Sequence, residues 1–110
     1  MTSPRGRFAH ASEAELAKLF DFYRIPWQYE PRTFPIVWND RGEAVEFFTP
    51  DFYLPEYDLY IELTVAKPER NTRKNRKVRL LRSNHPQVHV KLFTRRDVER
   101  LFSRSARSGA

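Results

Sequence analysis

Cysteine is absent from this chain of 110 residues, which excludes disulfide-stapled folds, thiolate metal sites and cysteine nucleophiles. Only three glycines occur, and they form no phosphate-binding loop. The three histidines, His10, His85 and His89, lack the mutual spacing of a zinc site. No apolar run approaches the roughly 20 residues of a membrane span, and the N-terminus lacks the apolar core of a signal peptide. We therefore expect a soluble, cytoplasmic protein with no membrane partner.

Charges of the two signs are distributed unevenly along the chain. Residues 1–66 hold 6 basic and 11 acidic side chains, whereas residues 67–110 hold 14 basic and 3 acidic ones, for a net charge of +6. An acidic part followed by a basic part suits a polyanion that is held beside a metal ion. We expect nucleic acid as the partner, with DNA as the first expectation.

The composition, 40% hydrophobic and 15% aromatic, is enough for one small core. We expect a single domain over residues 12–102, between a flexible lead of residues 1–11 and a disordered tail of residues 103–110. The domain should open with a helix, because Ser12 is a suitable N-cap and Glu15 completes a capping box. Apolar side chains then recur at helical spacing, namely Leu16, Leu19, Phe20 and Tyr23.

Residues 47–54 and 59–64 are rich in aromatic and β-branched side chains and flank a turn at residues 55–58, which predicts a β-hairpin. With the turn centred between Glu56 and Tyr57, every cross-strand pair is chemically matched. The predicted pairs are Leu54 with Leu59, Tyr53 with Tyr60, Phe52 with Ile61, and Asp51 with Glu62.

This register places the carboxylates of Asp51 and Glu62 opposite each other. Opposite residues have Cβ atoms roughly 5 Å apart, so two ionised carboxylates repel. A hard divalent cation removes that repulsion, and Mg²⁺ typically takes two carboxylates and fills its other positions with water and phosphate. The alternative is an exposed polar face whose acids are solvated or paired with arginine.

The remaining elements complete the order helix, three strands, helix, strand, helix. Strands are predicted over residues 27–38, with an interruption near Pro31, and from residue 43 into the hairpin. Residues 67–82 contain eight Lys or Arg and one acid, and predict a basic helix with Val78 and Leu81 inward. A strand at residues 88–93 and a helix at residues 95–102 follow. A helical crossover joins parallel strands, so we expect an α/β fold with a mixed four-stranded sheet flanked by helices.

The run Pro50-Asp51, followed after ten residues by Glu62-Leu63-Thr64, resembles the motif of the PD-(D/E)XK nuclease superfamily. The resemblance spans residues 12–102, and the opening segment SEAELAKLF is similar to that of transposon-end and very-short-patch-repair-like endonucleases. It implies a restriction-endonuclease-like α-β-β-β-α-β core and an endonuclease that hydrolyses phosphodiester bonds with Mg²⁺ or Mn²⁺. It also allows a homodimer.

The resemblance implies that Asp51, Glu62 and the backbone carbonyl of Leu63 ligate the metal. In such proteins a glutamate of the first helix joins the active site, and Glu15 is that residue here; otherwise it only closes the capping box. Residues of the basic helix would hold the nucleic-acid backbone without reading its sequence. These residues are Arg70, Arg73, Lys74, Arg76 and Lys77.

One position departs from the motif, because Thr64 stands where lysine is expected. Lys67 is the nearest lysine and the first candidate to orient or deprotonate the nucleophile, with Lys74 as the second. A missing lysine is also how inactive members look, and Lys67 could be an ordinary helix-start residue. Two other readings stay open: a nuclease-fold module that binds nucleic acid without cutting it, and an assembly module whose basic helix docks on an acidic protein.

Overall fold

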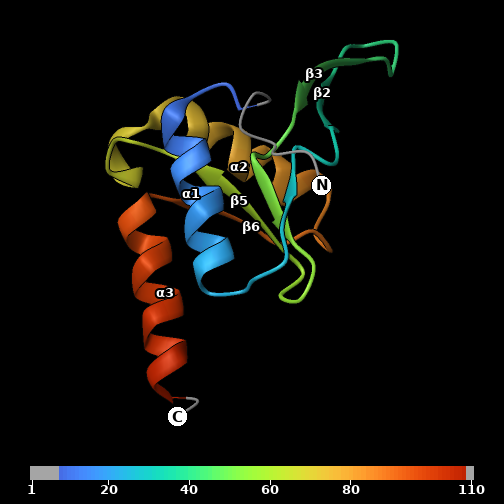
Figure 1. The fold of residues 1–110 in the computed structure, drawn as a ribbon. Coiled ribbons are helices and arrows are strands. Elements are labelled where there is room, and N and C mark those ends of the chain that lie inside the picture. Colours follow the sequence, from blue (N-terminus) through green and yellow to red (C-terminus); the bar gives the residue numbers. More distant parts are fainter. Residues whose placement is uncertain (1–7, 109–110) are drawn as a thin grey trace.

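The computed structural model describes the backbone of residues 8–108 and the side chains of residues 8–103. A mixed four-stranded sheet in the order β1-β4-β5-β6 carries helices on both faces, and β2 and β3 form a separate two-stranded sheet (Figure 1). The predicted α/β fold with a mixed four-stranded sheet is confirmed. The elements are α1 (Ala11–Phe22), β1 (Gln28–Tyr29), β2 (Phe34–Trp38), β3 (Ala44–Phe48), β4 (Phe52–Leu54), β5 (Leu59–Leu63), the 3-10 turn η2 (Pro68–Arg70), α2 (Thr72–Asn84), β6 (Val90–Phe93) and α3 (Arg95–Ser108).

The β4–β5 hairpin has the predicted register. Its antiparallel pairs are Phe52 with Ile61, Tyr53 with Tyr60, and Leu54 with Leu59. The turn is closed by a hydrogen bond of 3.0 Å from the backbone N–H of Tyr57 to the carbonyl of Leu54. Asp58 adopts a φ of +49°, a left-handed conformation that aspartate tolerates better than most residues.

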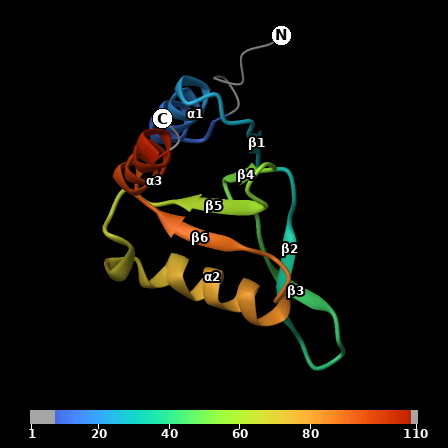
Figure 2. The same cartoon turned by 90° about the horizontal axis from the view of Figure 1, so that it is seen from below.

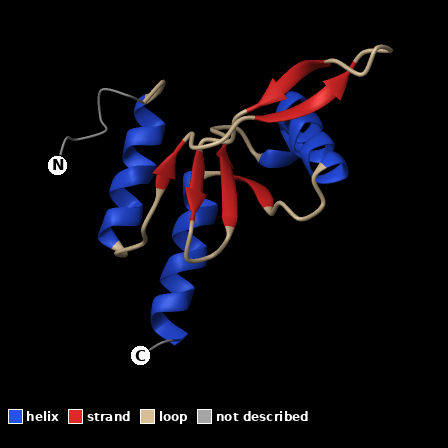
Figure 3. Ribbon diagram, turned by 90° about the vertical axis from the view of Figure 1, so that its right-hand side faces the viewer, coloured by secondary structure: helices blue, strands red, loops and turns tan. Residues whose placement is uncertain are grey.

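Two of the predicted strands are interrupted. The break at residues 30–33 confirms the interruption expected near Pro31, whereas the break at residues 49–51, within the expected strand over residues 47–54, was not predicted. Each gap contains a proline, Pro50 or Pro31, which lacks the N–H that a strand ladder needs. Beyond the gaps the two chains pair again as the β2–β3 arm, which lies beside α2 and projects from the sheet (Figure 3).

Two apolar clusters cover the two faces of the sheet. Helices α1 and α3 lie on one face, and α2 lies on the other (Figure 2). The first cluster includes Leu16, Phe20, Phe52, Ile61, Val98 and Phe102. The second includes Phe34, Ile36, Tyr60, Val78, Leu81 and Val90. The inward positions predicted for the basic helix, Val78 and Leu81, are therefore confirmed.

The first helix begins earlier than predicted. His10 is the N-cap residue and Ala11 the first helical residue, so Ser12 is not the cap and no side chain bonds to the free N–H groups. The predicted capping box is therefore wrong. The buried face of α1, which packs on the sheet, sets the phase of the helix instead; it comprises Glu13, Leu16, Ala17 and Phe20.

At both ends of the chain, structural elements extend into the segments expected to be a lead and a tail. In the expected lead, Phe8 packs edge-on against Tyr29 with ring centroids 4.6 Å apart; residues 1–7 lie outside the described residues. Helix α3 continues past Phe102 to Ser108, into the expected tail, because extending a formed helix through Ala and Arg costs little. Residues 109–110 lie outside the description. No helix within residues 8–108 has the length and apolarity that a membrane crossing requires.

Candidate active site

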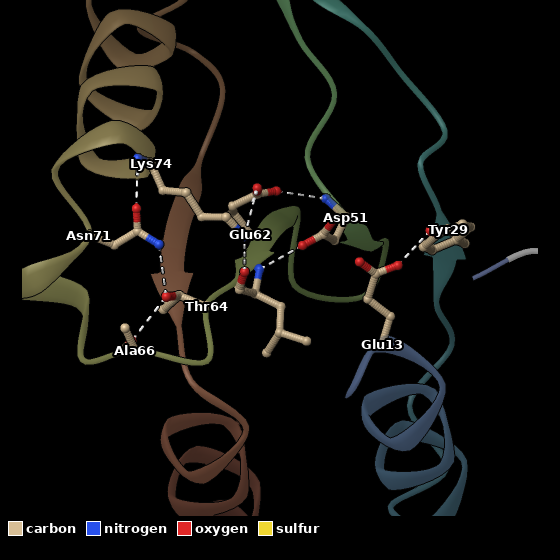
Figure 4. A network of polar contacts seen from close by, with 9 residues as sticks. Glu13, Tyr29, Asp51, Glu62, Thr64, Ala66, Asn71 and Lys74 are labelled. Atoms are coloured by element: carbon tan, nitrogen blue, oxygen red, sulfur yellow. Dashed lines mark hydrogen bonds and ion pairs between the residues drawn. The ribbon is translucent and has the colours of Figure 1, made fainter. Parts of the chain in front are cut away.

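Asp51 and Glu62 lie side by side at the edge where β4 begins and β5 ends (Figure 4). The backbone N–H of Asp51 donates to Glu62 Oε1 at 3.1 Å, and the backbone N–H of Leu63 donates to Asp51 Oδ2 at 2.8 Å. Each carboxylate therefore accepts a hydrogen bond from a backbone N–H on the other side of the hairpin. The structure brings together the two carboxylates that the hairpin register placed opposite each other.

Both carboxylates are buried, since Asp51 is 8% exposed and Glu62 is 7% exposed. Burial, reinforced by the charge of Asp51, raises the pKa of Glu62 from 4.5 to about 8. Burial also raises the pKa of Asp51, and the nearby charge of Glu13 adds to this effect. Lys74 lowers both pKa values but does not offset the burial. The pair therefore favours a compensating positive charge.

Lys74 is the lysine that reaches this pair. It belongs to the first turn of α2, and its Nζ lies 3.4 Å from Glu62 Oε2 and donates a hydrogen bond to the carbonyl of Leu63. The sequence made Lys67 the first candidate for this position and Lys74 the second. Lys67 is exposed and precedes η2, and no hydrogen bond or ion pair links it to the pair within the described residues. The chain passes through η2 before α2 turns back toward the sheet, and this return brings Lys74 rather than Lys67 to the carboxylates.

Thr64 occupies the position that the motif gives to lysine, and its side chain is fully engaged. It is 2% exposed; its Oγ1 donates to the carbonyl of Ala66 at 2.9 Å and accepts from Asn71 Nδ2 at 3.1 Å. Asn71 is also the N-cap of α2, because its Oδ1 accepts from the backbone N–H of Lys74 at 3.1 Å. The threonine is therefore joined to the start of the helix that supplies the lysine.

Glu13, rather than Glu15, is the first-helix glutamate beside the pair. Glu13 is 6% exposed and accepts a hydrogen bond of 2.5 Å from the hydroxyl of Tyr29. Burial and this hydrogen bond raise the pKa of Tyr29. The side chain of Glu15 is 57% exposed and lies 3.5 Å from Arg95 Nη1, so the structure does not bring Glu15 to the site.

A signal for Glu13 was present in the sequence. The residue precedes Leu16, Ala17 and Phe20 by three, four and seven positions, which is the spacing of a single helix face. The capping-box prediction, with Ser12 as the cap, selected Glu15 as the first-helix glutamate instead of Glu13. Tyr29, the partner of Glu13, carried no comparable signal, because its position depends on how β1 pairs with β4.

A cleft of about 270 Å³ opens beside the carboxylates, between the starts of α1 and α2. Three of its lining residues also act on the carboxylate pair. Leu63 donates a hydrogen bond to Asp51, Lys74 forms an ion pair with Glu62, and the charge of Glu13 raises the pKa of Asp51. The other lining residues are His10, Ser12, Val65 and Asn71. The cleft therefore reaches Glu13, Leu63 and Lys74, beside the carboxylate pair.

The oxygen atoms here are of the kind that hard cations prefer. Within the residues that the structure describes, no three His, Asp or Glu side chains are grouped to hold a metal ion. The nearest oxygen donors are two carboxylates, Asp51 and Glu62, and the carbonyl of Leu63. In this structure Lys74 Nζ contacts both Glu62 Oε2 and that carbonyl, so a cation there would share these oxygens with the lysine. Mg²⁺ is usually bound by one or two carboxylates together with water and phosphate, so this small set fits the ion's chemistry.

The predicted nucleic-acid contacts separate into three groups. Lys74 is directed to the carboxylates, and Arg76 forms two hydrogen bonds with Glu46 of β3, at 2.7 and 3.1 Å, which lower the pKa of Glu46. The remaining three form no ion pair with any described residue. They are Arg70, Arg73 and Lys77.

Comparisons with protein-family models, with curated proteins and with solved structures found no match for this chain. The geometry of the site therefore carries the functional argument.

The raised pKa of Glu62 predicts how the metal-free protein responds to pH. The folded pKa of about 8 lies above the ordinary 4.5, so the folded state binds more protons between these values. This contribution to stability is complete below the lower pKa and is lost as the pH rises through the upper one. We expect the thermal unfolding midpoint to fall across this range in chelator. Glu62→Gln should remove much of the decline, whereas Glu15→Gln should not; an unchanged pH dependence in Glu62→Gln would contradict the assignment.

Proposed function

We propose that the protein is a Mg²⁺-dependent or Mn²⁺-dependent endonuclease that hydrolyses phosphodiester bonds in nucleic acid, with DNA as the expected substrate. The observation that carries this proposal is the meeting of Lys74 with the buried pair Asp51 and Glu62 and with the carbonyl of Leu63. Two acids, a backbone carbonyl and a lysine are the groups that the PD-(D/E)XK motif brings together. Here they come together although lysine is absent from position 64.

The element order supports the same proposal. The structure has a helix, an antiparallel hairpin and a helical crossover to a parallel strand, an order that supports the proposed restriction-endonuclease-like core. The departure from that core is the β2–β3 arm, which interrupts the first two long strands at Pro31 and Pro50.

Asp51, Glu62 and the carbonyl of Leu63 would hold the cation. When bound, it supplies Lewis acidity, by neutralising charge on the phosphate and acidifying a water molecule. Glu13 lies near enough to influence the pKa of Asp51 and replaces Glu15 as the first-helix acid of the proposed site. Its hydrogen bond with Tyr29 fixes its orientation, so it can bind a water of the cation's shell.

Lys74 replaces Lys67 as the proposed catalytic lysine. Its ammonium group already lies among the oxygens of Glu62 and Leu63, at the wall of the cleft. From there it can donate hydrogen bonds to the attacking water or to a phosphate oxygen, which orients the nucleophile and offsets developing charge.

The binding-only alternative rested on Thr64, and the position of Lys74 weighs against it. Lys74 supplies, from α2, the ammonium group whose absence from position 64 suggested inactivity. The assembly-module alternative has no support from a specific contact of the described residues.

The choice between the two lysines predicts opposite phenotypes. Lys74→Ala should lower the Mg²⁺-dependent cleavage rate by roughly 10²- to 10⁴-fold, the usual effect of losing a proton-transfer group, and should largely preserve nucleic-acid binding. Lys67→Ala should leave the rate nearly unchanged, because Lys67 does not contact the pair. The assay uses duplex, branched and single-stranded substrates. The reverse pattern would restore Lys67 to the role, and no wild-type cleavage of any substrate would favour the binding-only function.

The three basic residues without an ion pair predict the salt dependence of binding. Replacing Arg70, Arg73 and Lys77 by alanine should reduce the slope of log K against log salt by roughly 2 to 3, about one unit for each lost phosphate contact. Measurements use Ca²⁺ in place of Mg²⁺ to prevent cleavage.

A matched control removes the same charge from the opposite side of the sheet. Lys18 on α1 and Arg96 and Arg100 on α3 are exposed and form no ion pair with a described residue, whereas α2 covers the other face (Figure 2). Replacing these three by alanine should leave the slope close to that of the wild type. Equal reductions in both triple variants would show that net charge, and not the α2 side of the molecule, governs binding.

A further inference from the structure

We propose that Thr64 and Asn71 are positioning residues that fix the start of α2 so that Lys74 reaches the carboxylates. The contacts themselves are independent of any activity, but their catalytic consequence rests on the proposed function. The inference assigns a role to the residue that replaces the motif lysine. Thr64 is then part of the arrangement that delivers a lysine from a different element.

Thr64 is a rigid point of attachment. It directly follows β5, it is 2% exposed, and its backbone N–H donates to the carbonyl of Phe93 in β6 at 2.9 Å. Its hydroxyl both donates, to Ala66, and accepts, from Asn71. The side chain is therefore fixed to the end of the same strand that carries Glu62 and Leu63.

Asn71 connects this point to the helix. Its Nδ2 donates to Thr64 Oγ1 at 3.1 Å, and its Oδ1 accepts from the backbone N–H of Lys74 at 3.1 Å (Figure 4). Asn75 supports the same turn, since its Nδ2 donates to the carbonyls of Asn71 and Pro68. One amide side chain thus links the end of β5 to the backbone of the residue whose ammonium contacts Glu62.

This link matters because a lysine on a separate helix lacks a fixed distance to the carboxylates. A motif lysine at position 64 would share the strand of Glu62, so the strand geometry alone would place it. Lys74 instead depends on how α2 sits against β5. A shift of about 1 Å at a catalytic group can cost roughly 10²-fold in rate, so a contact that fixes the helix start has a catalytic effect.

Ordinary helix capping is the competing explanation, and two variants separate it from positioning. Thr64→Val keeps the shape of the side chain and removes the hydroxyl, whereas Thr64→Ser keeps the hydroxyl. Asn71→Ser keeps a good N-cap for α2 but is too short to bridge to Thr64. Positioning predicts that Thr64→Val and Asn71→Ser share one phenotype and that Thr64→Ser resembles the wild type.

The first measurement does not require activity. In crystal structures, Thr64→Val and Asn71→Ser should each lose the contact between Lys74 Nζ and Glu62 Oε2, with Val78 and Leu81 still buried against the sheet. A wild-type contact between Lys74 and Glu62 in both variants would overturn the proposal. If Thr64→Val does not fold, Asn71→Ser provides the same test. A wild type that cleaves nothing would remove the proposed function and leave this result interpretable.

The second measurement is kinetic. Thr64→Val and Asn71→Ser should lower kcat by roughly 10- to 100-fold with KM for the nucleic acid unchanged, because the lysine is misplaced while the binding residues remain. Thr64→Ser should restore most of kcat. Wild-type kcat in Thr64→Val, or a loss in Thr64→Ser equal to that in Thr64→Val, would contradict positioning by the hydroxyl.

Discussion

The burial of two carboxylates side by side is the constraint on which the rest of this site depends. Glu62 accepts a hydrogen bond from the backbone N–H of Asp51, and Asp51 accepts one from the backbone N–H of Leu63, so separating the two carboxylates breaks at least one of these bonds. Their raised pKa values express the cost of placing negative charge in a buried position. A site of this kind gains from any positive charge brought to it, and the basic second half of the chain supplies one.

The positive charge is that of Lys74 on α2, ten residues beyond position 64, where the motif has its lysine. Because Thr64 cannot provide an ammonium group, the site depends on the packing of α2 against the sheet and on the side chain that joins them. The apolar contacts of Val78 and Leu81 hold the helix on the sheet, and the polar contact at Asn71 fixes where it begins. The packing of α2 against the sheet therefore both stabilises the fold and places Lys74 in the site.

Local chemistry was sufficient to predict the hairpin, because the turn residues and the matched pairs agree on a single register, of which three pairs are formed by β4 and β5. It did not identify Glu13, and it gave Lys74 only as the second candidate after Lys67. The phase of α1 is set by which face the sheet buries, and capping residues alone predicted it wrongly. The place of Lys74 depends on how the chain returns after η2, which is a tertiary property that neither spacing nor composition contains. The strand interruptions were foreseen at Pro31 but missed at Pro50.

The central claim is that the oxygens of Asp51, Glu62 and Leu63 form a site for a divalent cation. Anomalous diffraction from crystals of the protein grown with Mn²⁺ tests it directly. The account predicts a peak about 2 Å from an oxygen of each of these three residues, and its loss in Asp51→Asn. Mn²⁺ peaks confined to other parts of the molecule, with none between the two carboxylates, would contradict the account.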